Sequence, residues 1–595
     1  MKQQKEASTE VDRGSATKTI KRIWSYLAVH KRLLNAVLIM VLLSSGLALL
    51  GPFIIGRTID THLSAQNANG LGIILVGLAF VYLLHSLSLW LQNYWMIGIA
   101  QETVFSMRTE LFSKLHKLPI RFFDKRQSGE LMSRVTNDIE NVSTTLNSSV
   151  IQIFSSILTL VGTLAVMLWL SPLLTLVTMT IVPLMFLGMK WITDRTGRLY
   201  KEQQKHLGEL NGFIEESISG QRIIKAFSQE EKVISEFLIK SENVKKAGYW
   251  AQVYAGFIPK LMNMLNNLSF TLVAAVGGFF ALKGMVTIGT IVIFTEYARQ
   301  FTRPLNDLSN QFNTLLSAVA GADRVFDIID EVEETSDEKQ SKVISMLKGK
   351  VEFRDVAFAY EKDENTVNGL SFLARPGESV ALVGPTGAGK STIINLITRF
   401  YEPASGKILF DDQDSMNIQR ESLRNHMAFV LQESFLFQGT IRENIRYGRL
   451  DATDEEVEKA AIMANAYSFI KRMPKGFDTE LSQDGSGISQ GQKQLLSIAR
   501  AILADPSILI LDEATSSIDT ITEIKIQEAL SLLMKGRTTF IIAHRLNTIQ
   551  QADQILVVDR GQIIEKGSHD ELLKKRGFYH SLYQNQLRKD HVQAQ

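Results

Sequence analysis

The chain has 595 residues, of which 45% are hydrophobic, with 64 basic and 62 acidic side chains and no cysteine. This length exceeds that of one ordinary domain, so at least two folding units are expected. A net charge of +2 supplies no field that would draw the chain to nucleic acid, which we exclude as a favoured partner. Without cysteine the chain can form no disulfide, thiolate nucleophile or cysteine metal site.

The composition changes along the chain and divides it into regions. Almost all long apolar runs lie before about residue 320, and almost all glycine-punctuated, strand-like runs lie after residue 350. We therefore predict a polar cytosolic tail over residues 1–17, a membrane domain over 18–320, a linker over 321–348 and a soluble α/β domain over 349–595.

The first half contains runs that predict membrane-spanning helices. Residues 33–55 carry no charged side chain, and about 20 apolar residues suffice to cross a bilayer as a helix. Buried helices of a large soluble protein are the alternative, but such helices are usually shorter and have polar faces. Six spans are predicted, because five similar runs begin near Leu71, Ile151, Leu173, Leu261 and Ile288.

The order of the spans predicts their topology. Only Ser171 and Pro172 separate the third span from the fourth, which indicates a tight helical hairpin. An even number of spans places both termini on one side of the membrane. Basic residues are concentrated before the first span and are scarce in the loop after it, so this side is predicted to be the cytosol.

Charged, helix-favouring sequence follows the second and fourth spans and predicts extensions into the cytosol. A helix that runs on for roughly 25 residues carries its tip about 40 Å beyond the bilayer. Residues 122–134 and 217–231 are the predicted tips, because glycine and polar residues interrupt the helical periodicity there. Each tip is either a solvated turn or a docking surface for another domain, and the sequence does not separate these alternatives.

Polar residues in the last two spans are candidates for a substrate cavity. Glu296 and Arg299 are costly if they face lipid, so we expect them to face a cavity or to pair with each other. A direct role for Glu296 as a substrate ligand stays open, and Asn266 either lines the same cavity or hydrogen-bonds between helices. Aromatic side chains in this region would suit amphipathic or cationic compounds. They are Phe270, Phe279, Phe294 and Tyr297.

The segment "SVALVGPTGAGKSTIINLI" is an apolar strand, a glycine-rich loop and a helix start, and it fits the phosphate-binding pattern GxxxxGK[ST]. Backbone N–H groups of such a loop surround phosphate oxygens, and the helix N-terminus adds positive potential. Lys390 would reach the β and γ phosphates, Ser391 would ligate Mg²⁺, and Thr392 would hold a further phosphate oxygen. The loop itself comprises Gly384, Pro385, Thr386, Gly387, Ala388 and Gly389.

Two later strands end in candidates for catalysis. The run "SILILDEATSSID" ends a buried strand in two carboxylates, which would place Asp512 near Mg²⁺ and Glu513 where it can polarise an attacking water. The run "TTFIIAHRL" ends in His544, whose imidazole would sense the γ phosphate and hold the water. A lone histidine at this position is more often structural, but its order after the two carboxylates favours catalysis.

In this order, and after six predicted spans, the motifs resemble those of an ABC exporter half-transporter, in which one transmembrane domain is fused to one nucleotide-binding domain. The resemblance implies a type IV exporter fold, with a six-helix membrane domain and an α/β P-loop NTPase domain. It implies that Tyr360 stacks on adenine, although a buried strand aromatic is the alternative. It also implies that Gln432 links Mg²⁺ and the attacking water to the cytosolic tips.

The segment "ISQGQ" resembles the family's signature motif, usually written LSGGQ, which clamps the γ phosphate held by the opposite subunit. The implied contacts come from Ser489, Gln490, Gly491 and Gln492. Since this chain has one nucleotide-binding domain, it must dimerise. Gln490 stands where the family usually has glycine. It removes a residue that tolerates positive φ and close phosphate approach, although its amide can donate hydrogen bonds of its own. This departure is similar to the asymmetry of heterodimeric bacterial exporters. A heterodimer with a second half-transporter is therefore favoured, and a homodimer stays open.

The predicted function is ATP-driven, multidrug-type export of small amphipathic or hydrophobic compounds across the plasma membrane, with ATP and Mg²⁺ as cofactors. Both termini would be cytosolic, membrane lipids would surround the spans, and the compact loops suggest a bacterial source. A lipid or lipopeptide flippase is one alternative. An ATP-gated channel or a regulatory subunit is another, although the presence of Glu513 argues against a purely regulatory role.

Overall fold

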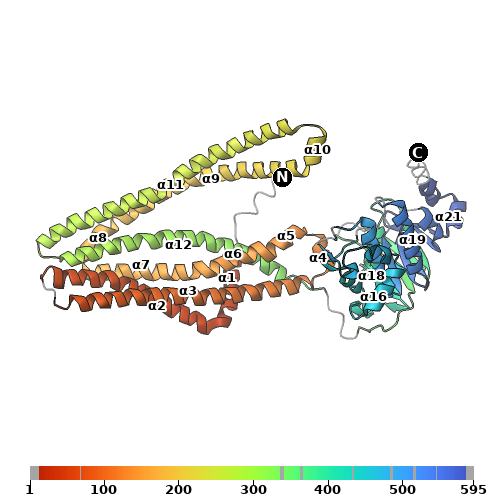
Figure 1. The fold of residues 1–595 in the computed structure, drawn as a ribbon, viewed down its shortest axis with the longest axis horizontal. Coiled ribbons are helices and arrows are strands. Elements are labelled where there is room, and N and C mark those ends of the chain that lie inside the picture. The colour runs from red at the N-terminus through yellow and green to blue at the C-terminus, as the bar shows by residue number, and fades with distance from the viewer. Residues whose placement is uncertain are drawn as a thin grey trace. The chain divides into compact units, whose positions relative to one another are not determined.

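The computed structural model describes residues 13–66, 69–334, 341–361, 366–431, 434–482, 485, 487–512, 518–543 and 546–584. The chain forms two compact units, whose elements are labelled in Figure 1. Met1–His116 and Ser128–Glu331 form a helical unit, whereas Lys117–Gln127 and Val332–Gln595 form an α/β unit. A short segment that interrupts the helical unit in the sequence therefore belongs to the α/β unit.

The helical unit consists of long helices because its sequence contains long apolar runs with few helix-breaking residues. Short helical segments join the long ones and include turns of π-helix at Ile59–Leu63, Arg134–Asp138 and Thr145–Ser149. The helices are α1 (Arg13–Leu27), α2 (Lys31–Thr58), α3 (Leu71–Leu115), α5 (Ser128–Ser133), α6 (Ile139–Thr144), α7 (Val150–Leu170), α8 (Pro172–Met179), α9 (Ile181–Ser219), α10 (Gln221–Ala226), α11 (Glu230–Leu282) and α12 (Ile288–Ile329).

Five of the six predicted spans are helical segments long and apolar enough to cross a membrane. The sixth predicted run lies in α12, which is 42 residues long, but α12 is not among these candidates. Glu296, Arg299 and Arg303 explain the difference, because they interrupt its apolar run with charge. The five segments are Thr17–Leu63, Leu71–Leu115, Ser128–Leu170, Pro172–Ser219 and Glu230–Leu282.

The predicted break between the third and fourth spans is confirmed. Helix α7 ends at Leu170, and α8 begins at Pro172, a residue that is well tolerated in the first turn of a helix. Ser171 lies between them in an extended conformation, and its hydroxyl accepts a hydrogen bond from the Leu174 N–H at 3.4 Å. This side-chain cap satisfies one of the backbone donors left free at the start of α8.

Two of the four aromatic residues expected to line a cavity are instead part of the packed core. Phe294 and Tyr297 are fully buried in a cluster that also contains Met167, Leu174 and Val273. The Tyr297 hydroxyl donates a hydrogen bond to the backbone carbonyl of Leu49 at 2.6 Å, which satisfies its polar group inside the bundle. The other two, Phe270 and Phe279, are exposed in this chain.

The second predicted tip lies at the end of a pair of long helices. Figure 1 shows α9 and α11 running side by side toward the short helix α10. Three large apolar side chains at this end, those of Ile218, Ile223 and Phe227, are exposed. An exposed apolar patch of this kind favours a docking surface over a solvated turn.

The α/β unit is built around a six-stranded sheet in the order β12-β11-β3-β10-β9-β6. Its strands are parallel except for β12, which pairs antiparallel with β11. The sequences of these strands are continuous apolar runs, because both faces of a parallel sheet are covered by other elements. The bounds are β3 (Ser379–Val383), β6 (Met427–Val430), β9 (Ile508–Asp512), β10 (Thr538–Ile542), β11 (Gln554–Asp559) and β12 (Gln562–Gly567).

Alternating residues of this sheet enter two separate cores. In β3, Ala381 and Val383 belong to one apolar cluster, whereas Val380 and Leu382 belong to the other. This division follows from the two-residue period of a strand, which turns successive side chains to opposite faces. The first core also contains residues of α16 (Asp454–Met463), α18 (Gln490–Ala504) and α19 (Thr520–Met534).

The second core lies between the six-stranded sheet, helix α13 (Lys390–Ile397) and a four-stranded antiparallel sheet of order β2-β1-β4-β5. The α/β unit is therefore layered around the parallel sheet. The smaller sheet comprises β1 (Val351–Phe358), β2 (Val367–Ala374), β4 (Ser405–Phe410) and β5 (Gln413–Asp414). The remaining elements are α4 (Ile120–Asp124), α14 (Arg420–Arg424), β7 (Gly439–Thr440), α15 (Ile441–Arg446), α17 (Tyr467–Ile470), β8 (Glu480–Leu481), α20 (Leu546–Gln551) and α21 (His569–Lys575).

Candidate functional site

The candidate nucleotide site lies where the parallel strands β3, β10, β9 and β6 end. In the sheet register, Ile542 of β10 is paired with Leu382 on one side and with Asp512 on the other. Val430, the last residue of β6, is paired with Leu511. The carboxyl ends of these strands therefore meet at one edge, which is where open α/β sheets bind their ligands.

The glycine-rich loop joins β3 to α13 at this edge. Gly389 has a φ of 105°, which disfavours residues with a side chain, and α13 begins at Lys390 directly after it. The Lys390 ammonium group donates hydrogen bonds to the carbonyls of Gly384 and Pro385, at 2.8 and 2.9 Å. Burial lowers the pKa of Lys390, and the nearby Asp512 carboxylate opposes this shift. The loop thus presents a helix N-terminus and a partly desolvated cation, as phosphate binding requires.

Tyr360 lies close to the same helix but also belongs to an aromatic cluster. Its ring makes edge contacts with Phe358 and Tyr401, each with centroids 4.9 Å apart. Its hydroxyl lies 3.4 Å from the Thr392 hydroxyl and accepts a hydrogen bond from the Asn395 amide at 3.1 Å. Tyr360 is half-buried, so it packs in the fold and is still partly accessible to a ligand.

The signature segment forms the beginning of helix α18. Ser489 caps the helix: its hydroxyl accepts the Gln492 N–H at 3.3 Å, and the Gln492 side chain accepts the Ser489 N–H at 2.9 Å. Gln490 is the first residue of α18, is exposed, and is not among the residues with positive φ. Of the two properties of glycine that Gln490 removes, tolerance of positive φ is therefore not used at this position, and close approach of a phosphate stays a prediction. Its effect on the site must come from its side chain.

Gly491 is required by close packing between two helices. A Cβ atom at this position would lie 2.4 Å from the Thr522 Cγ2 atom and 3.1 Å from the Ile518 Cγ2 atom. The glycine therefore allows the first turn of α18 to approach α19 closely. This contact fixes the position of the helix N-terminus that the signature segment presents.

Three expected catalytic residues, Gln432, Glu513 and His544, lie outside the described residues. The described chain reaches Leu431, Asp512 and Ala543, the residues directly before each of them, and Asp512 lies at the strand edge described above. The roles of the three residues stay predictions.

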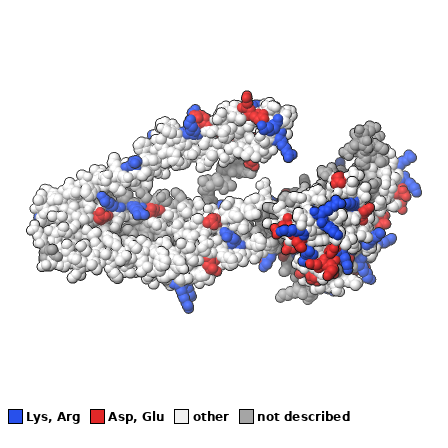
Figure 2. Space-filling view, viewed as in Figure 1, with Lys and Arg blue, Asp and Glu red and all other residues white. Residues whose placement is uncertain are grey.

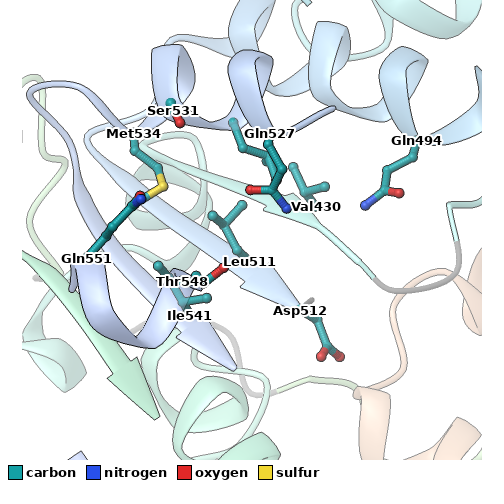
Figure 3. Close-up of a pocket in the computed structure, with 11 residues that line it drawn as sticks. Val430, Gln494, Leu511, Asp512, Gln527, Ser531, Met534, Ile541, Thr548 and Gln551 are labelled. Atoms are coloured by element: carbon teal, nitrogen blue, oxygen red, sulfur yellow. The ribbon is translucent and has the colours of Figure 1, made fainter. Parts of the chain in front are cut away.

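Asp512 is also one of the residues that line a small cavity (Figure 3). It encloses about 40 Å³, far less than the roughly 300–1,000 Å³ of a typical ligand pocket. Gln494, Gln527 and Gln551 are among its lining residues, so its wall is polar enough to hold ordered water. Its size excludes it as the nucleotide site, which we place at the open sheet edge.

The first predicted tip contains the short helix α4, which docks on the α/β unit. Phe122 is buried, and the Tyr401 hydroxyl donates a hydrogen bond to the Asp124 carboxylate at 2.5 Å. Arg121 donates to the backbone carbonyl of Tyr360 at 3.0 Å. Burial raises the pKa of Tyr401, and the Asp124 carboxylate raises it further, so the phenol keeps its proton and remains a donor. Of the two alternatives for this tip, the docking surface is confirmed.

Asp124 lies in the first predicted tip, but no sequence pattern points to its partner Tyr401, which is far away in the chain and belongs to no motif. The sequence analysis also missed Arg500 of α18, which donates hydrogen bonds to the carbonyls of Asn444 and Phe435 at 2.9 and 3.2 Å. Arg500 therefore ties the signature helix to the segment that follows Gln432. A basic residue in the largely apolar second half of α18 was the available signal.

Replacement of Tyr401 by Phe is expected to lower the amount of substrate transported per ATP hydrolysed. The variant keeps the aromatic ring but loses a hydrogen bond to a charged group, which contributes about 1.5–3 kcal/mol. Parallel assays of dye transport and phosphate release in proteoliposomes measure this ratio. Asp124→Asn should give a smaller loss, because its amide oxygen still accepts from Tyr401 but carries no charge. An unchanged ratio in Tyr401→Phe would show that this contact does not contribute to coupling.

Comparison with known proteins places both units in one family. Residues 34–305 match the family described as "ABC transporter transmembrane region", and residues 367–516 match the family described as "ABC transporter". The chain is 64% identical over 571 residues to "Uncharacterized ABC transporter ATP-binding protein YfiC" of Bacillus subtilis (strain 168), with 96% of this chain and 94% of that protein covered.

Other relatives have names that mention a substrate. The chain is 45% identical to "Fatty acid ABC transporter ATP-binding/permease protein" of Mycobacterium bovis (strain ATCC BAA-935 / AF2122/97), with 84% of this chain and 79% of that protein covered. It is 38% identical to "Putative multidrug export ATP-binding/permease protein YgaD" of Bacillus subtilis (strain 168), with coverages of 83% and 85%.

A solved structure shares the fold along nearly the whole chain. "Structure of a bacterial Atm1-family ABC exporter with ATP bound" matches with a TM-score of 0.75 and 30% identity, over 94% of this chain and 99% of that one. The helical unit is therefore membrane-embedded, and the α/β unit binds ATP and hydrolyses it to drive transport. The chain belongs to the ABC transporter family and is a half-transporter of the type IV exporter fold that acts as part of a dimer.

Proposed function

We propose that this chain exports small amphipathic or hydrophobic compounds across the plasma membrane, as multidrug-type efflux. The observation that carries this proposal is that one chain joins a candidate phosphate-binding sheet edge to long apolar helices. One of these helices, α11, exposes aromatic residues. The names of two relatives, which mention fatty acids and multidrug export, support the amphipathic class. We further propose that both termini face the cytosol, because basic residues precede the first span.

At the proposed site, the loop 384–389, Lys390 and Thr392 bind the phosphates, and Tyr360 stacks on adenine. Ser391, Asp512 and Gln432 would hold Mg²⁺, which takes oxygen ligands and keeps several waters. The described residues fit this ion: Ser391 is exposed next to Lys390, and Asp512 is near enough to affect the pKa of Lys390. Mg²⁺ would neutralise charge on the transferred phosphoryl group. Glu513 orients and deprotonates the water, and His544 holds it in line.

We propose that the partner is a different half-transporter chain. Support comes from Gln490, whose exposed side chain lies at the first turn of α18, where the signature segment would approach the partner's ATP through Ser489, Gly491 and Gln492. A side chain at this point restricts the approach of a phosphate, which would make one of the two ATP sites weaker. Purification of this chain alone tests the idea. A stable homodimer with full, substrate-stimulated ATP hydrolysis would contradict it.

ATP-driven dye movement in inverted membrane vesicles tests the export proposal. Vesicles that contain this chain and its partner are expected to accumulate an amphipathic dye against its gradient when ATP is added. A non-hydrolysable ATP analogue should give no accumulation, because ATP drives the cycle only through its different affinities for the two states of the dimer. Dye movement that merely equilibrates across the membrane would indicate a channel and would contradict export.

A further inference from the structure

Helix α12 carries four charged side chains along one face. Glu296, Arg299, Arg303 and Asp307 follow one another at spacings of three, four and four residues, which places them on one side of a helix. Figure 2 shows charged side chains over α12 in an otherwise largely uncharged part of the helical unit. Charges in such a position are costly against lipid, so they indicate a polar or ligand-bearing surface.

Each acidic side chain of this row has a polar partner closer than the partner of Arg303. Glu296 pairs with Arg299 at 3.6 Å, as the sequence spacing permits. Asp307 accepts a hydrogen bond from the Gln152 amide of α7 at 2.8 Å, whereas its distance to the Arg303 guanidinium is 4.0 Å, the outer limit of an ion pair. The Arg303 side chain is 86% exposed and that of Asp307 only 29%. The most accessible charge of the row is therefore positive.

An exposed aromatic ring lies beside Arg299, the basic neighbour of Arg303 in this row. The Arg299 guanidinium lies over the Phe270 ring of α11, 5.8 Å from its centroid. Phe270 is exposed. A cation next to an exposed aromatic ring is complementary to a molecule with an anionic head and an apolar tail.

We propose that Arg299 and Arg303 bind the headgroup of an anionic amphipath, a long-chain carboxylate, as the transported compound. This inference rests on the proposed export function and narrows its substrate class. Residues four apart on a helix have Cβ atoms about 5–6 Å apart, so two guanidinium groups can bracket one carboxylate. Glu296 is already paired with Arg299, and Arg303 repels cations, so the cationic compounds suggested by the sequence fit this surface less well.

The test compares two probes that differ only in headgroup charge. A fluorophore-labelled dodecanoate and its methyl ester are offered to the reconstituted dimer, and both equilibrium binding and ATP-driven movement are measured. Arg303→Gln is expected to weaken binding of the carboxylate about tenfold or more and to leave the ester nearly unchanged. Arg303→Lys should restore part of the loss. Lys283→Gln removes a cation over Phe279 at the end of α11 and is the matched control.

A second variant gives an effect of opposite sign. Asp307→Asn removes the acid that competes for Arg303, and its amide oxygen can still accept from Gln152, so binding of the carboxylate is expected to become tighter. A residue that served only to stabilise the helix would weaken binding of both probes when changed. This sign difference keeps the test informative even if Arg303→Gln folds poorly.

The outcomes separate the headgroup site from the transport function. Equal loss of both probes in Arg303→Gln, or preferred binding of a cationic dye, would overturn the carboxylate site and leave amphipath export intact. Binding of the carboxylate that depends on Arg303, without ATP-driven movement of either probe, would overturn export and leave the site in place.

Discussion

Exchange of Glu513 for Gln is expected to lower steady-state ATP hydrolysis by about a hundredfold to ten-thousandfold, the range for loss of a positioned general base. The amide has nearly the same shape as the carboxylate but cannot take a proton from the attacking water. Phosphate binding by the loop and Lys390 does not depend on this residue. The variant should therefore bind ATP and accumulate in an ATP-bound, closed dimer with little turnover.

Two measurements check this expectation for Glu513→Gln. Phosphate release gives the turnover, and retention of labelled ATP after rapid gel filtration gives the trapped state. Glu455→Gln is the control, since it removes the same charge from the exposed first turn of α16. Hydrolysis at the wild-type rate in Glu513→Gln would exclude this residue as the base.

Replacement of Lys390 by Ala is expected to remove ATP binding and hydrolysis together, with a loss of activity of about a hundredfold to a thousandfold. The Lys390 ammonium group supplies the partly desolvated charge at the phosphate loop and also holds the carbonyls of Gly384 and Pro385. Its removal takes away attraction for the phosphates in the ground state as well as in the transition state.

Thermal stability distinguishes the two variants. A ligand that binds only the folded protein stabilises it by about 2.7 kcal/mol when its concentration is 100 times its dissociation constant. ATP should therefore raise the melting temperature of the wild type and of Glu513→Gln but not that of Lys390→Ala. Lys407→Ala, which removes an exposed lysine paired with Asp414 at 3.6 Å, should behave as the wild type. An ATP-dependent shift of normal size in Lys390→Ala would contradict the assigned role.

Local sequence patterns predicted the parts of the fold that depend on periodicity. Apolar runs gave five of the spans, and the pair Ser171–Pro172 gave the break between α7 and α8. The sixth span stays a prediction, because Glu296, Arg299 and Arg303 interrupt its apolar run. The ion pair between Glu296 and Arg299 was expected because both partners lie on one helix.

Long-range contacts could not be read from the sequence. The hydrogen bond between Asp124 and Tyr401 joins residues that no motif relates, and the burial of Phe294 and Tyr297 depends on which face of α12 packs against the bundle. The backbone at Gln490 depends on local capping. The family preference for glycine drew attention to positive φ, whereas Ser489 caps an ordinary helix that starts at Gln490.

The exposed end of the α9–α11 pair affects the lifetime of a newly synthesised chain. Ile218, Ile223 and Phe227 are exposed there in a single chain, and groups of this kind promote aggregation and attract chaperones and proteases. A chain that has not yet dimerised would keep this surface exposed. The cellular amount of this chain is therefore expected to depend on how fast the dimer assembles, so that slow assembly shortens the lifetime of the subunit.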